Sequence, residues 1–157
     1  KARIDHDKCA GCGRCLAACP KDVIQPSSGS SVKSLNCKMA EYSLAVCKGR
    51  PNFHVSLVCD VSPNCDCHAE NDIPIIPDVG MFASFDPVAL DVACADAVNR
   101  MPVIEGSVLS DNIREDEHHG KGHDHFHMTH PDTEWKSCIE HAVKIGLGNS
   151  QYELEEI

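Results

Sequence analysis

The sequence lacks several features that would place it in a familiar class. No apolar run approaches the ~20 residues needed to span a bilayer, so insertion into a membrane is not expected. Basic residues are scarce, because 14 Lys and Arg stand against 24 Asp and Glu and give a formal net charge of −10. Such a charge argues against binding to nucleic acid or anionic lipid, and it favours electrostatic docking to a basic partner protein.

The chain also lacks a signal peptide and the regular cysteine spacing of a disulfide framework, although it holds 11 cysteines. This combination predicts a reducing, cytoplasmic location, in which cysteines are more often metal ligands than disulfides. A Gly-rich nucleotide loop and an obvious pair of nucleophile and base are missing as well. The sequence therefore leaves open whether the protein is an enzyme.

What the sequence does contain is a cysteine run of a well-defined kind. Four cysteines and a proline follow the spacing of bacterial ferredoxins, at Cys9, Cys12, Cys15, Cys19 and Pro20. Thiolates are soft, anionic ligands, and ferredoxins wrap such a run around a [4Fe–4S] cluster. Gly11 and Gly13 permit close approach of the backbone to the cluster sulfides. The run therefore predicts a [4Fe–4S] cofactor held by these four cysteines.

The fourth cysteine of the run allows more than one assignment. In two-cluster ferredoxins this cysteine binds the other cluster, and the sequence contains no second run. Either a first run precedes Lys1 in a longer parent protein, or Cys19 closes the local cluster, or a later cysteine contributes. The later candidates are Cys37, Cys47, Cys59, Cys65 and Cys67. We favour a missing upstream run, which predicts that this chain is a fragment and that a second cluster or metal ion accompanies the first.

Two further groups of residues carry metal-binding side chains. Cys59 ends an expected strand, and Cys65 and Cys67 follow as a Cys-x-Cys pair that is able to place both sulfurs on one metal. The alternative is a plain cysteine-rich turn. Residues 110–132 are expected to form an exposed loop, and six of the ten histidines lie in it. Alternating histidines make a candidate site for Zn, Ni or Cu, with adventitious binding as the alternative; they are His123, His125 and His127.

Apolar periodicity and capping signals predict an α+β fold, α/β-like in its main part, with a ferredoxin-like insert. Residues 1–26 would form half of a ferredoxin module, residues 25–35 a flexible connection, and residues 36–157 the C-terminal part of an α/β domain. Helices are expected at about 37–48, 86–99 and 134–145, and strands at 53–61 and 79–83. Met39, Leu44 and Val46 are expected to be buried. The cysteines on these helices are expected to be packing residues: Cys37, Cys47, Cys94 and Cys138.

With these residues in view, the chain resembles the uncharacterised iron–sulfur centre proteins of the domain of unknown function 362 family. The resemblance rests on residues 9–20, 39–42, 63–67, 74–80, 85–91 and 146–148, in the family's order. It implies a ferredoxin insert within a larger α/β domain whose chemistry is not settled. It also implies a longer N-terminus with another cysteine run, which agrees with a missing upstream run. The histidine-rich stretch departs from the family pattern and is interpreted as an insertion.

Three hypotheses of function follow from the sequence. The favoured one is a redox protein that transfers electrons to a partner protein through its [4Fe–4S] centre. The second is a cluster-dependent oxidoreductase with an active site near Cys65, Cys67 and Asp78. The third is a metal-handling protein that uses the histidine-rich stretch.

Overall fold

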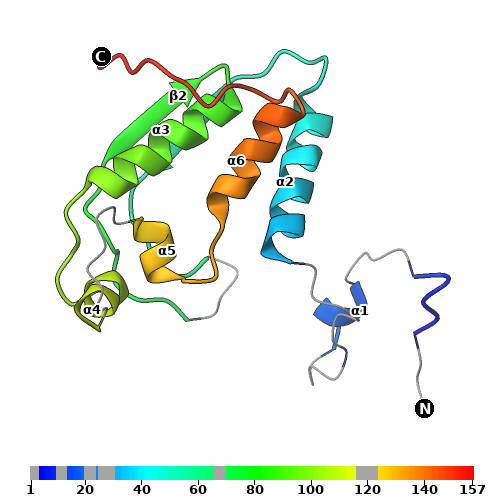
Figure 1. Cartoon of the computed structure of the whole chain (residues 1–157), viewed down its shortest axis with the longest axis horizontal. Coiled ribbons are helices and arrows are strands. Elements are labelled where there is room, and N and C mark those ends of the chain that lie inside the picture. Colours follow the sequence, from blue (N-terminus) through cyan, green and yellow to red (C-terminus); the bar gives the residue numbers. More distant parts are fainter. Residues whose placement is uncertain (1–3, 10–13, 20–23, 25–30, 66–69, 116–123) are drawn as a thin grey trace. The chain divides into compact units, whose positions relative to one another are not determined.

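The computed structural model describes residues 4–9, 14–19, 24, 31–65, 70–115 and 124–157, and Figure 1 shows how the chain is built. The chain divides into two compact units, Lys1–Ser30 and Ser31–Ile157. Each unit is considered by itself below. Helices and strands both occur, which confirms the predicted α+β class. In the described residues, no helix is both long and apolar enough to cross a membrane.

The described residues of the first unit include one short helix, α1 (Arg14–Ala17). A turn precedes Cys9, whose backbone N–H donates to the His6 carbonyl at 3.4 Å. After α1, the Ala18 N–H donates to the Arg14 carbonyl at 3.0 Å and completes one helical turn.

Two helices of the second unit, α2 (Val32–Cys47) and α6 (Trp135–Lys144), pack against each other. Ser31 caps α2, because its Oγ accepts from the Ser34 N–H at 3.2 Å. The prediction that residues 25–35 form a flexible connection is therefore wrong from residue 32 onward. Asn36, the residue just before the predicted helix start, lies inside the helix and donates to the Glu134 carbonyl at 2.8 Å and to Ser137 Oγ at 2.9 Å.

The side of α2 that packs on α6 is not the one that the sequence indicated. Ala40 is buried there, and Leu44 is half-buried. Met39 and Val46 were expected to be buried but are 54% and 67% exposed. The small Ala40 permits close approach to α6, and the larger side chains lie on another side of the helix.

A two-stranded antiparallel sheet is formed by β1 (His54–Val58) and β2 (Gly80–Ser84). Both strands confirm predicted positions. The first strand is shorter than predicted because Asp60 follows it with a positive φ of 48°, which an extended strand does not accommodate. The register pairs Val55 with Ala83 and Leu57 with Met81.

Helix α3 (Pro87–Arg100) contacts both strands and confirms the predicted helix. Asp86 Oδ1 caps it by accepting from the N–H groups of Val88 and Ala89 at 2.9 and 3.0 Å. The main core lies between this helix, the sheet and the chain that follows. Its buried side chains are Val58, Ile75, Ile76, Val98 and Leu109.

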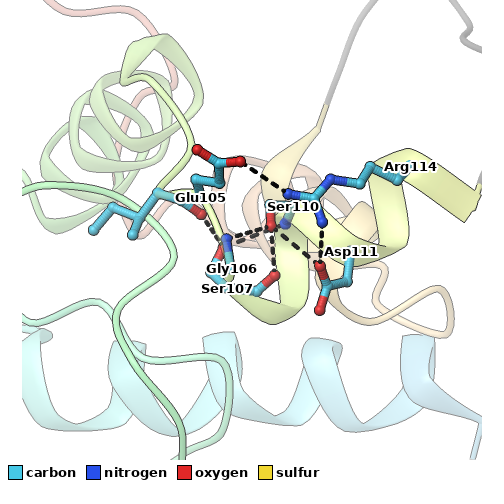
Figure 2. Close-up of polar contacts among 7 residues, drawn as sticks. Glu105, Gly106, Ser107, Ser110, Asp111 and Arg114 are labelled. Carbon is cyan, nitrogen blue, oxygen red and sulfur yellow. Dashed lines mark hydrogen bonds and ion pairs between the residues drawn. The ribbon is translucent and has the colours of Figure 1, made fainter.

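The stretch 110–132 is not one exposed loop, which corrects the prediction. Helix α4 (Val108–Glu115) enters it and α5 (His125–Thr129) lies within it, and the two helices contact each other. Figure 2 shows the polar network at the start of α4, in which Ser110 N–H donates to Ser107 Oγ at 3.2 Å and Gly106 N–H donates to Ser110 Oγ at 2.9 Å. Ser107 is therefore the N-cap of α4, and Ser110 satisfies the N–H of Gly106, the residue before the cap. The buried Leu109 then ties α4 to the core.

Candidate functional site

The cysteine run lies in the first unit, and the structure describes three of its four cysteines. Cys9 follows the turn at residues 6–8, Cys15 lies on α1, and Cys19 follows the turn that ends α1. Cys12 lies outside the described residues. Cys9 and Cys15 are exposed and Cys19 is half-buried, and none of the three is in a disulfide.

This donor set fits an iron–sulfur cluster. Cluster iron takes thiolate sulfur, and the accessible thiols of Cys9 and Cys15 are open to an incoming metal without unfolding of the chain. The single turn of α1 separates Cys15 from Cys19 by four residues, so the chain advances by about one helical turn between them. The fit rests on the thiolate donors and their spacing, because the structure does not bring Cys9, Cys15 and Cys19 together as a ready-made metal site.

The second cysteine group lies on a loop of the second unit whose two sides are held together by asparagines. Asn71 Nδ2 donates to Ser62 Oγ at 2.9 Å, and Asn71 Oδ1 accepts from the Asn64 N–H at 3.2 Å. Cys65 lies between these two sides and is exposed. Cys67 lies outside the described residues. The loop is thus closed by its own polar side chains at the point where the Cys-x-Cys pair begins.

Cys59 and Asp78 flank this loop in the sequence: Cys59 precedes it and Asp78 follows it. Cys59 is exposed and directly follows β1. Asp78 Oδ1 accepts from the N–H of Asp60 at 2.9 Å, and Asp60 is the residue with positive φ. The carboxylate of Asp78 therefore stabilises the backbone turn behind Cys59, which gives it a structural role.

The described histidines point to different partners. His125 is 4% exposed, and its Nδ1 donates to the Val98 carbonyl at 2.9 Å. His127 is exposed, with Nδ1 3.4 Å from the Thr133 carbonyl. Two positions apart on α5, these rings lie about 200° apart around the helix and do not converge on one ion. His123 lies outside the described residues.

One histidine connects this region to the cysteine loop. His130 Nε2 donates to the carbonyl of Pro63 at 2.6 Å, two residues before Cys65. Sequence reasoning missed this contact, because 67 residues separate the two partners. Among the described residues, no group of three or more His, Cys, Asp or Glu side chains is placed to hold a metal ion.

The cysteines on the helices are half-buried: Cys37, Cys47, Cys94 and Cys138. Burial raises the pKa of the Cys94 thiol, and the nearby charge of Asp91 adds to this, against a hydrogen bond with Ser56 that lowers it. Burial likewise raises the pKa of the Cys138 thiol. These two cysteines stay protonated at neutral pH and behave as small apolar groups, in keeping with a packing role.

The fold and the cysteine pattern together define a mixed helix-and-strand protein with a surface cysteine run. The chain matches the family described as "Domain of unknown function (DUF362)" over residues 5–96, which is more than half of its length. The chain therefore belongs to this family, which confirms the family named from the sequence. No curated protein and no solved structure matches the chain.

Proposed function

We propose that this protein binds a [4Fe–4S] cluster through Cys9, Cys12 and Cys15, with Cys19 serving this cluster or a neighbouring one, and transfers single electrons to a partner protein. The observation that carries the proposal is the ferredoxin spacing of the four cysteines, combined with the exposure of Cys9 and Cys15. When bound, the cluster supplies a one-electron redox centre. A ligand set at the surface suits exchange with a partner, because electron transfer needs close approach of the two centres.

The negative net charge of the chain favours a partner protein with a basic surface. A net charge of −10 speeds association with a positively charged surface and keeps the protein from anionic ones. Electron transfer is favoured over a reaction at the Cys65 loop because Asp78, the acid–base candidate there, is bonded to the Asp60 backbone.

The proposal is tested by substitution of the run followed by iron analysis. Anaerobic reconstitution of the wild-type chain should give about four irons and four sulfides per chain. Cys9→Ser, Cys12→Ser and Cys15→Ser should each lower the iron content by more than half, because each removes one ligand. Cys19→Ser should do the same if Cys19 closes the local cluster.

The matched controls come from the same chain. Cys138→Ser changes a half-buried packing cysteine of the second unit and should leave the iron content unchanged. Cys65→Ser measures whether the cysteine loop contributes a ligand. An equal loss of iron in Cys15→Ser and Cys138→Ser would mean that the run is not the binding site.

A further inference from the structure

One face of the two-stranded sheet is made of apolar side chains and is exposed. Side chains along a strand point alternately to the two faces of the sheet. One face packs on α3, and every second residue therefore points to the other face. The residues on this outer face are Phe53, Val55, Leu57, Met81, Ala83 and Phe85, and we refer to them as the outer sheet face. Phe53 and Phe85, at one end of the strands, contact each other with tilted rings whose centroids lie 5.0 Å apart.

The exposure of these side chains is high. Phe53 and Val55 are 57% and 55% exposed, Leu57 and Met81 are 67% and 70% exposed, and Phe85 is 79% exposed. The opposite face of the same strands holds the buried Val58 and the half-buried Phe82, which pack into the core. The inner face of the sheet is therefore covered, whereas the apolar outer face is not covered by any part of the chain that the structure describes.

The outer sheet face is larger than the apolar patches that stable monomers leave in water. From the exposed fractions, its six side chains present roughly 700 Å² per chain, above the 300–600 Å² of the largest patch on a typical monomer. Two such faces in contact would bury about 1,400 Å², within the range of specific protein interfaces. The area alone thus suffices for a stable association of two equal faces.

We propose that the outer sheet face is an interface between two copies of this chain, packed sheet against sheet. In a two-fold dimer each residue meets the same patch on the other copy, so a like charge in the patch would repel its counterpart. Neither strand carries Asp, Glu, Lys or Arg at any position. Apolar sheets also pack well face to face, at about 10 Å separation. A basic redox partner, in contrast, has no charge to recognise on this face.

The net charge of the chain gives this interface a distinctive response to salt. Two copies of charge −10 repel each other, and added salt screens that repulsion while the apolar contact is retained. Dimerisation should therefore strengthen as ionic strength rises. A complex with a basic partner should weaken under the same change.

The test is analytical ultracentrifugation of the reconstituted full chain at micromolar concentrations, under anaerobic and reducing conditions that exclude disulfide-linked dimers. The wild-type chain should sediment as a dimer, with a dissociation constant that falls as salt is raised. Leu57→Glu and Leu57→Lys should each raise the dissociation constant by at least about tenfold, because each places like charges opposite each other. An equimolar mixture of the two variants should dimerise again.

A control variant distinguishes the outer sheet face from the exposed apolar side chains of other elements, and a separate measurement verifies folding. Leu35→Glu changes a leucine on α2 that is 54% exposed and should leave the dimer intact. Far-UV circular dichroism verifies that each variant is folded, and recovery of the mixture shows the same independently. A wild-type monomer at all salt concentrations would overturn the proposal, as would a dimer broken by Leu35→Glu and not by the Leu57 variants. The proposal does not depend on the cluster, since the apo chain contains the same face.

Discussion

Asp86 shows how one residue joins distant parts of the second unit. Its Oδ1 caps α3, and its Oδ2 accepts from the N–H of Asn149 at 2.8 Å, 63 residues away. Burial opposes ionisation of Asp86, but the hydrogen bonds from Ala89, Asn149 and Val88 outweigh it and lower its pKa below the usual value. The sequence predicts the cap from Asp86-Pro87, but the bond to Asn149 depends on the fold. This difference is typical, because caps are local and long-range polar contacts are not.

Asp86→Ala should destabilise the second unit by about 1–2 kcal/mol at neutral pH, the usual effect of a lost N-cap. Because the pKa is lowered in the folded state, the carboxylate contributes fully above its unfolded pKa of about 3.9. The contribution is lost as pH falls through the lower folded pKa. Urea unfolding followed by Trp135 fluorescence should therefore show a difference between wild type and variant that shrinks below about pH 4. A difference that stays constant from pH 7 to pH 3 would contradict this account.

A substitution at Gly148 provides a second test of the role of the Asp86 carboxylate. A Cβ on Gly148 would overlap Asp86 Oδ1, so Gly148→Ala should displace the cap and destabilise the unit. In the Asp86→Ala background the overlap is absent, and Gly148→Ala should cost less there than in the wild type. Equal costs in the two backgrounds, measured by urea unfolding, would show that the overlap is relieved without moving Asp86.

The elements of the fold differ in how far the sequence predicts them. The two strands and α3 follow from local signals: β-branched residues, Asp86-Pro87 and a regular apolar repeat. Helices α4 and α5 were missed because they are short and polar, and they depend on a few core anchors such as Leu109 and Phe126. The boundary of α2 was missed because a serine cap in a Ser-rich stretch resembles a linker.

The contact between α2 and α6 depends on Asn36 in the structure. Asn36→Ala removes two hydrogen bonds, to the Glu134 carbonyl and to Ser137 Oγ. The expected loss is about 1–3 kcal/mol of unfolding free energy, measured by urea denaturation. Lys38→Ala, at an exposed position of the same helix, serves as the control and should change the stability by less than about 0.5 kcal/mol. If both variants lose the same free energy, Asn36 does not hold the two helices together.

At the scale of the whole molecule, the proposed function rests more on the sequence than on the fold. The cysteine spacing follows from iron–sulfur chemistry and needs no tertiary contact to be recognised. The histidine trio is different, because its interpretation as a metal site assumed a loop, and α5 sends His125 and His127 to opposite sides. The outer sheet face also became visible only with the pairing of β1 and β2, since its residues come from two segments.

The central claim, a one-electron [4Fe–4S] centre on the cysteine run, is tested most directly by electron paramagnetic resonance of the reconstituted chain. Reduction with dithionite should produce a signal of about one unpaired electron per chain, and mild oxidation should remove it reversibly. The Cys15→Ser variant, treated identically, should lose the signal. A wild-type chain that holds iron but gives no signal on reduction, or a signal that survives in Cys15→Ser, would contradict the account.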